Sequence, residues 1–327
     1  MNILAIRFAR LGDVILLLPA LASLKRAFPD ARLTFLTGHR CAPIAELCPA
    51  IDEVVAVDRI ALRDGPILSA LQEMGRLVLD IRRRRFNLVI DFHSLRETNL
   101  LTWLSAAEVR FGMQRYKAPY LRFCFNRPPI AEDKSLHVAE MFGKVVQVLG
   151  AATVPQLLCV PDDLKRWAIE IEPNEPRLVL YVDAPVPERI WPPERFAAVA
   201  NAAVDKLGAV PIVITSKQGE HLAKRVELAC RNHEKVASFT DLSIPQMAAL
   251  IASARLLVSN DTGPMHLGPA FGVRTLGLFS VGFPEHFRPI GPDDRFMRAN
   301  PIERIETGDV IAAVEEMWAT AGPGLRC

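Results

Sequence analysis

Two series of alternating strand-like and helix-like segments constrain how this 327-residue chain folds. In each series, short runs rich in Val, Ile and Leu are separated by longer segments with helical spacing. Such alternation predicts a parallel sheet with helices on both faces. The expected strands are Ile3–Phe8, Leu33–Leu36, Val54–Val57 and Leu88–Phe92 in the first series, and Leu178–Val182, Pro211–Thr215, Leu256–Ser259 and Thr275–Phe279 in the second.

The spacing also predicts where the helices lie and where the chain divides. A proline-rich stretch from Pro155 to Pro176, around a short charged helix, separates the two series. We therefore expect two Rossmann-like domains, residues 1–160 and 161–327, with ligands in a cleft beyond the carboxyl ends of the strands. In this arrangement the last helix can pack back on the first domain. The expected helices are 14–28, 67–82, 95–105, 136–149, 194–207, 220–230, 245–253, 264–271 and 309–320.

The first 22 residues superficially resemble a secretory signal. Arg7 and Arg10 precede an apolar run, Val14–Leu18, and an Ala-Leu-Ala string follows. Asp13 interrupts this segment, however, and the residues before it already indicate a buried strand. The apolar run is also too short to span a bilayer. We expect a core helix here and a cytoplasmic protein.

Charge and cysteine content narrow the classes of partner. Residues 1–150 carry 21 Lys and Arg against 15 Asp and Glu, so the first half is positive although the whole chain has a net charge of only +2. This favours an anionic partner there, although the run Arg82–Arg85 equally suits the negative end of a helix. Aromatic residues are not interleaved with the charge, so nucleic-acid binding is not indicated. The six cysteines form no C-x-x-C pair, which predicts reduced thiols.

Asp13 is the first candidate for chemistry. It lies in Arg10-Leu11-Gly12-Asp13, which follows the first strand and opens the first helix. Gly12 permits a tight turn or close approach of a ligand. Asp13 is either a helix cap, for which aspartate is favoured, or a general base at the carboxyl end of a strand.

The second candidate is the segment Ser259–His266. It follows an apolar strand, and Pro264 suits the first position of a helix. The backbone N–H groups of Asp261, Thr262 and Gly263 would then point toward an anion such as a diphosphate. Ordinary capping is the alternative.

Three loops hold further polar candidates. Arg189 lies before a proline-started helix, where its guanidinium suits a phosphate, and Glu220 opens a helix, where it can accept hydrogen bonds from a ribose. His286 and Arg288 lie in the Gly- and Pro-rich stretch 279–292, which we expect to cover the cleft. No histidine pair with metal-ligand spacing and no Asp-x-Asp string occurs, so neither a metal nor a cofactor is indicated.

These motifs, taken in order, resemble the lipopolysaccharide heptosyltransferases, glycosyltransferase family 9. The similarity covers nearly the whole chain and centres on the signature 260–267. At three places the chain differs. Arg189 stands where the family usually has lysine, and residues 280–282 read Ser-Val-Gly where Gly-Pro-Thr is usual. Near the signature helix, Gly268-Pro269 and Arg274 replace commoner small residues and proline. The matching segments are 11–14, 18–21, 91–99, 110–112, 191–196, 249–267 and 279–291.

The resemblance implies the GT-B fold and an inverting, metal-independent transfer of a sugar, such as heptose from ADP-heptose. Asp13 would be the base that deprotonates the acceptor. The acceptor would be an anionic lipopolysaccharide core bound by the first domain, with peripheral contact at the inner membrane. The implied donor site is Arg189, Glu220, Asp261, Thr262, Gly263, Pro264 and His266, and the implied acceptor site is Arg10, Gly12, Arg115 and Lys117.

Two other classes share this architecture. A sugar-nucleotide-binding protein without transfer activity would bind nucleotide only. An NAD-dependent oxidoreductase would need the fingerprint G-x-G-x-x-G after a strand, and the chain contains no such string.

Overall fold

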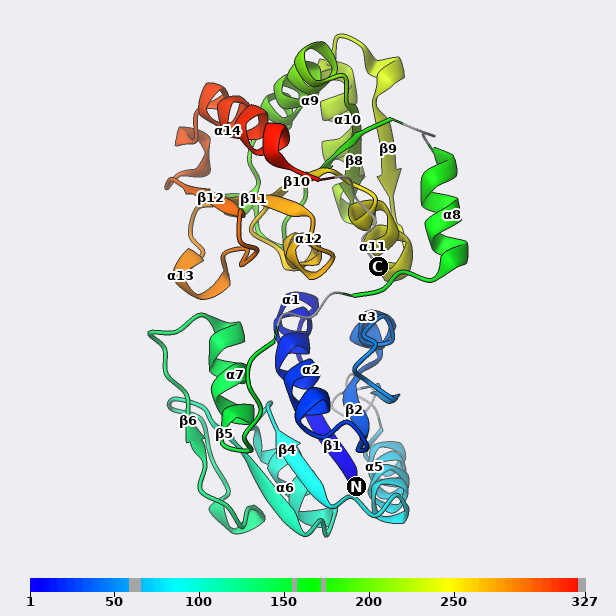
Figure 1. Cartoon of the computed structure of the whole chain (residues 1–327), viewed down its shortest axis with the longest axis vertical. Coiled ribbons are helices and arrows are strands. Elements are labelled where there is room, and N and C mark those ends of the chain that lie inside the picture. Colours follow the sequence, from blue (N-terminus) through cyan, green and yellow to red (C-terminus); the bar gives the residue numbers. More distant parts are fainter. Residues whose placement is uncertain (59–65, 155–157, 172–174, 323–327) are drawn as a thin grey trace. The chain divides into compact units, whose positions relative to one another are not determined.

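The computed structural model describes residues 1–58, 66–154, 158–171 and 175–322. The chain divides into two compact units, Met1–Gln156 and Leu157–Cys327 (Figure 1). Each unit is built around its own parallel sheet, as the alternating pattern predicts.

The sheet of the first unit has the strand order β3-β2-β1-β4-β5-β6. Its middle strands are buried on both faces, which is typical of a parallel sheet between two helical layers. In register, Ile3 lies between Leu33 and Leu88. The strands are β1 (Asn2–Arg7), β2 (Arg32–Gly38), β3 (Glu53–Val57), β4 (Leu88–Asp91), β5 (Val109–Gln114) and β6 (Ile130–Ala131).

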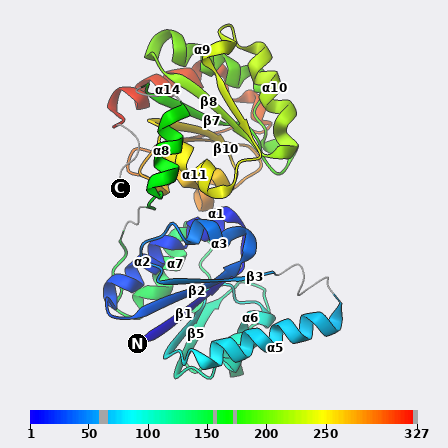
Figure 2. The ribbon, with the colours of Figure 1, turned by 90° about the vertical axis from the view of Figure 1, so that its right-hand side faces the viewer.

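Helices cover both faces of this sheet. α2 packs against α7 on one face, and α5 and α6 lie on the other (Figure 2). The expected single helix over residues 14–28 is wrong, because the chain breaks at Leu16 and Leu17 and Pro19 stands in the first turn of the second helix. The helices are α1 (Leu11–Ile15), α2 (Leu18–Ala27), α3 (Ala42–Ala45), α5 (Ile67–Arg83), α6 (Arg96–Leu104) and α7 (Val138–Gln147).

The second unit repeats the plan with the strand order β12-β11-β10-β7-β8-β9. Its core contains the fully buried Trp191 and Phe196, whose rings meet edge to face. The strands are β7 (Arg177–Tyr181), β8 (Val210–Thr215), β9 (Ala237–Thr240), β10 (Leu256–Asn260), β11 (Arg274–Phe279) and β12 (Arg295–Arg298).

The helices of this unit close both faces of its sheet. α8, which lies in the stretch expected to be a linker, packs against α11, so that part of the stretch belongs to the second unit. The last helix, α14, packs against α9. The helices are α8 (Asp162–Ile171), α9 (Pro193–Leu207), α10 (Glu220–Ala229), α11 (Ile244–Ala252), α12 (Leu267–Ala270), α13 (Pro284–Phe287) and α14 (Thr307–Thr320).

The cysteines depart from expectation at one position. Cys41, Cys48, Cys124 and Cys230 are free and buried, but Cys159 is disulfide-bonded. The expectation of reduced thiols throughout is therefore wrong, because the absence of a C-x-x-C pair does not exclude other disulfides. Cys327 lies outside the described residues.

Within the described ranges, no helix is both long and apolar enough to cross a bilayer.

Candidate functional site

Asp13 occupies the third position of α1 rather than its cap. The N-cap is Arg10, and no side chain caps this helix. The carboxylate of Asp13 instead accepts a hydrogen bond from Arg7, with 3.0 Å between Nη2 and Oδ1. Its side chain keeps 28% of its exposure, and its Oδ2 makes no hydrogen bond to the rest of the described chain. The capping interpretation is therefore wrong, and one carboxylate oxygen is open to a ligand.

Arg7 is the residue that fixes Asp13, and the sequence analysis did not identify it. It ends β1, and its buried guanidinium donates to the carbonyl of Phe92 at 2.6 Å. The guanidinium carbon also lies 4.7 Å from the ring centre of Phe142. Burial lowers the pKa of Arg7, and the Asp13 carboxylate acts in the opposite direction. Two hydrogen bonds and an aromatic face thus hold this cation at the carboxyl end of the strand.

Asp91 holds the neighbouring strand end. Its Oδ1 accepts from the N–H groups of His93 and Ser94, and its Oδ2 accepts from the amide of Asn99 at 2.8 Å. Burial raises the pKa of Asp91, while these hydrogen bonds act in the opposite direction. A side chain at Gly112 would meet the backbone of Asp91 at 2.5 Å. This network fixes the turn that carries the Phe92 carbonyl, and through it Arg7.

The four residues expected to bind the acceptor have different environments. Arg10 is exposed at the start of α1, and Gly12 is a buried residue of that helix. Gly12 is not among the glycines with positive φ, so no tight turn requires it. Arg115 is close enough to Arg7 to contribute to the lowering of its pKa. The ammonium of Lys117 lies 5.2 Å from the centre of the Tyr116 ring.

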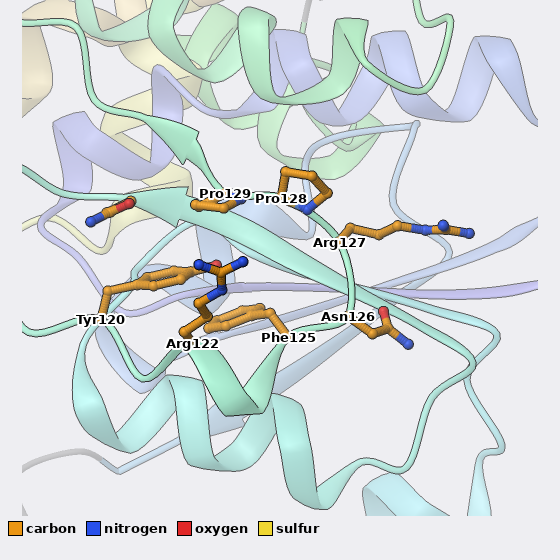
Figure 3. Close-up of a pocket in the computed structure, with 8 residues that line it drawn as sticks. Tyr120, Arg122, Phe125, Asn126, Arg127, Pro128 and Pro129 are labelled. Atoms are coloured by element: carbon orange, nitrogen blue, oxygen red, sulfur yellow. The ribbon is translucent and has the colours of Figure 1, made fainter.

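A cavity of about 540 Å³ lies beside the last strands of the first unit (Figure 3). The rings of Tyr120 and Phe125 stack at 4.6 Å, and the side chain of Asn126 is tied to the backbone of Glu108 and Arg110. This cavity contains none of the expected site residues. It is lined by Gln114, Tyr120, Arg122, Phe125, Asn126, Arg127, Pro128 and Pro129.

In the second unit, Arg189 pairs with Asp261. The Nη1 atom of Arg189 lies 3.1 Å from Oδ2 of Asp261. Asp261 is buried at the end of β10, and burial raises its pKa, whereas Arg189 acts in the opposite direction. Arg189 is therefore not a solvated loop side chain but is held beside the signature segment.

The signature segment forms a different turn from the one expected. The N–H of Asp261 donates to the carbonyl of Leu278 at 3.0 Å, so it is not available to a ligand. Thr262 and Gly263 keep their N–H groups free of bonds to the described chain. Pro264 and the buried His266 lie in a 3-10 turn, Gly263–His266, before the four-residue α12, instead of in one continuous helix.

The loop after β11 contacts this pair directly. The hydroxyl of Ser280 donates to the carbonyl of Glu188, next to Arg189. A side chain at Gly282 would overlap the carboxylate of Asp261. Residues 280 and 282, which differ from the family's usual Gly-Pro-Thr, therefore support Arg189 and leave room for Asp261. The short helix α13 follows, with His286 partly exposed and Arg288 exposed.

Glu220 opens α10 after β8, and the sequence analysis missed a carboxylate, Asp183, that contacts the turn before it. Glu220 is exposed and pairs with Lys224 at 2.8 Å, which lowers the pKa of its carboxyl group. Nearby, Asp183 accepts from the N–H and hydroxyl of Ser216. A side chain at Gly219 would meet the Asp183 carboxylate at 2.7 Å. Asp183 lies just beyond the end of β7, and this position at a strand end is the signal by which the sequence could have revealed it.

Metal-ligating side chains do not cluster within the described ranges: no three His, Cys, Asp or Glu residues are placed to hold a metal ion.

Comparison with known proteins agrees with this architecture. The chain is 27% identical to lipopolysaccharide heptosyltransferase 1 of Pseudomonas aeruginosa, over 85% of this chain and 78% of the relative. A family 9 glycosyltransferase structure from Veillonella parvula matches with a TM-score of 0.87 and 23% identity, covering 98% and 97% of the two chains. An Escherichia coli heptosyltransferase determined with ADP matches with a TM-score of 0.81 and 21% identity, covering 97% and 100%.

The fold is therefore GT-B, the architecture of glycosyltransferases with two Rossmann-like units, as expected. The model of glycosyltransferase family 9 (heptosyltransferase) matches residues 74–308, and the chain belongs to that family. The resemblance inferred from the motifs is confirmed, and the protein is a glycosyltransferase.

Proposed function

We propose that this glycosyltransferase moves heptose from ADP-heptose to a lipopolysaccharide-core acceptor, with inversion and without a metal ion. Its relatives include lipopolysaccharide heptosyltransferases, and similar E. coli structures were determined with ADP and with ADP-2-deoxy-2-fluoro heptose. The observation that carries the proposal is Asp13, whose carboxylate is anchored by Arg7 through one oxygen and open at the other.

Asp13 acts as the general base. An acceptor hydroxyl attacks the anomeric carbon of heptose while the Asp13 carboxylate takes the hydroxyl proton. The new bond joins the acceptor oxygen to the anomeric carbon, and the bond from that carbon to the diphosphate oxygen breaks. ADP leaves with the electron pair. A carboxylate in this role accelerates transfer by roughly 10²–10⁴-fold, and a single displacement inverts the anomeric centre.

The second unit stabilises the departing diphosphate. Arg189 supplies a positive charge, and the N–H groups of Thr262 and Gly263 supply donors that need no reorganisation. Asp261 positions Arg189. Pro264 and His266 shape the turn beside these donors. Glu220 accepts hydrogen bonds from the ribose hydroxyls, and these replace part of its present contact with Lys224.

The first unit binds the acceptor. Arg10, Arg115 and Lys117 offer positive charge to an anionic sugar, and Gly12 lets the acceptor approach α1. Residues 1–150 carry the basic excess that suits such a partner. Because this acceptor is part of a membrane lipid, the protein works at the cytoplasmic side of the inner membrane in peripheral contact.

Calorimetric titration with ADP, UDP, GDP, dTDP and NAD⁺, without added metal, tests the donor assignment. We expect selective binding of ADP, followed by transfer from ADP-heptose. A preference for another nucleoside diphosphate would replace the donor, and binding of NAD⁺ alone would contradict the proposed reaction. Nucleotide binding without transfer to any core acceptor would indicate a binding protein.

A further inference from the structure

The helices α5 and α6 carry apolar side chains on their outer side as well as toward the sheet. Met74, Leu77 and Ile81 of α5 face the core of the first unit. Leu68, Leu71 and Leu79 of the same helix are exposed, Leu68 to 72%. Their separations of three, eight and eleven residues place them on one side of the helix. Core packing accounts for the first set but not for the second.

α5 packs against α6, and α6 packs against the 3-10 turn Arg122–Cys124. Both α6 and this turn carry further exposed apolar side chains. Trp103 and Phe123 meet edge to face at 6.1 Å, and Phe123 is 63% exposed. We call this surface the outer helical face. Among the side chains of the first unit that the structure describes, six of the nine exposed large apolar ones lie on it, namely Leu68, Leu71, Leu79, Leu100, Trp103 and Phe123.

Exposed arginines lie on the same elements as these apolar side chains, or directly beside them in the chain. Asp80 is already paired with Arg84, so it does not neutralise the others. Glu73 and Glu97 are the exposed acids of the two helices. The Nε of Arg82 donates to the carbonyl of Leu104 and so joins the end of α5 to the end of α6. The exposed arginines of these elements are Arg76, Arg82, Arg83, Arg85, Arg96 and Arg122.

We propose that the outer helical face binds the surface of an anionic phospholipid bilayer. Exposed Trp, Phe and Leu flanked by Arg are the groups that enter the boundary between headgroups and acyl chains. Arginines near an anionic leaflet each strengthen such binding. A second copy of the chain is a poorer occupant, because it would oppose the same arginines across the interface. The outer helical face is then the surface through which the protein makes the peripheral membrane contact proposed above, and this binding does not require the transfer reaction.

Vesicle co-sedimentation without donor or acceptor tests this surface. The vesicles are phosphatidylcholine alone or phosphatidylcholine mixed with phosphatidylglycerol. We expect binding to the mixed vesicles, weakened about tenfold or more by the pair Leu68→Gln and Leu71→Gln and also weakened by Trp103→Ala. The matched control is Leu228→Gln on α10, since Leu228 is 88% exposed in the second unit. Equal binding by these variants and the control would overturn the proposal.

Arginine substitutions test how much positive charge contributes to vesicle binding. The pair Arg76→Gln and Arg83→Gln should weaken binding to mixed vesicles by roughly fivefold for each arginine, whereas Arg304→Gln, an exposed position of the second unit, should not. Undiminished binding by the Arg76/Arg83 pair would contradict the proposal. Light scattering without vesicles tests whether a second copy of the chain occupies the face instead. A dimer that dissociates when Leu68→Gln and Leu71→Gln are introduced would show that it does. Because no substrate is present, these results do not depend on the proposed transfer activity.

Discussion

The Nη2 atom of Arg7 lies 3.0 Å from Oδ1 of Asp13, while its Nη1 atom donates to the carbonyl of Phe92, 85 positions along the chain. One buried cation thus ties the first helix to the turn after β4. The carboxylate of Asp13 takes its orientation from the interior of the first unit, and not from a cap of its own helix.

Replacing Arg7 tests whether this orientation matters to catalysis. Arg7→Lys keeps the positive charge. The lysine ammonium, however, lacks the planar fork with which the guanidinium donates to Asp13 and to the carbonyl of Phe92 at once. We expect the transfer rate at saturating donor to fall about 10- to 100-fold through loss of alignment, with the ADP dissociation constant unchanged. Arg32→Lys, at an exposed ion pair on β2, is the control. A loss of ADP affinity in place of rate would show that Arg7 has another role.

We expect a glycine at position 282 to be required for donor binding, because a side chain there would overlap the Asp261 carboxylate. In Gly282→Ala the new methyl group overlaps the Asp261 carboxylate, so the Asp261–Arg189 pair must shift. We predict a free energy of unfolding lower by about 1–3 kcal/mol and weaker ADP binding by calorimetry. Gly308→Ala, in the first turn of α14, has open space around it and should lower neither the free energy of unfolding nor the affinity for ADP. Wild-type ADP affinity in Gly282→Ala would separate this loop from the donor site.

Removing Arg189 should change both donor binding and the pH dependence of stability. Arg189→Ala should weaken ADP binding about 10- to 100-fold, as expected when a charged hydrogen bond is lost. Arg189→Lys should restore part of it, whereas Arg304→Ala should bind normally. If Arg189→Ala binds ADP like the wild type, Arg189 is not a diphosphate ligand.

The sign of the pH effect follows from the pKa of Asp261. Burial raises this pKa, so the carboxyl group contributes most to stability below its unfolded pKa and loses that contribution as pH rises through the folded value. Arg189 acts in the opposite direction, so Arg189→Ala raises the pKa of Asp261 further. Urea titrations at several pH values should show stability falling with pH over a wider range in this variant.

The fold was predictable because buried strands of a parallel sheet are continuous apolar runs. β1, β4, β7 and β8 were expected within one residue of their ends. Four strands were missed. β6, β9 and β12 are short, partly exposed edge strands, such as Arg295–Arg298, and carry no apolar run. β5 lies inside the sheet, but Arg110 and Gly112 interrupt its apolar residues. The break before α2 was missed because apolar spacing continues through it.

The site was predictable only in part. Strand ends and the family signature pointed to Asp13, Arg189 and Asp261. The roles of Arg7, Ser280 and Gly282 depend on partners between 6 and 92 positions away, which no local pattern marks. Asp13 looked like a cap because aspartate is common there, but α1 begins two residues before it and its carboxylate pairs with Arg7, which the sequence does not reveal.

Asp13→Asn tests the central claim most directly. The measurement is single-turnover transfer from ADP-heptose to a lipopolysaccharide-core acceptor, alongside calorimetry with ADP, with the exposed Asp30→Asn as the matched control. The proposed role of Asp13 as the general base predicts a rate about 10²–10⁴-fold lower with ADP affinity retained. Transfer at the wild-type rate would contradict it.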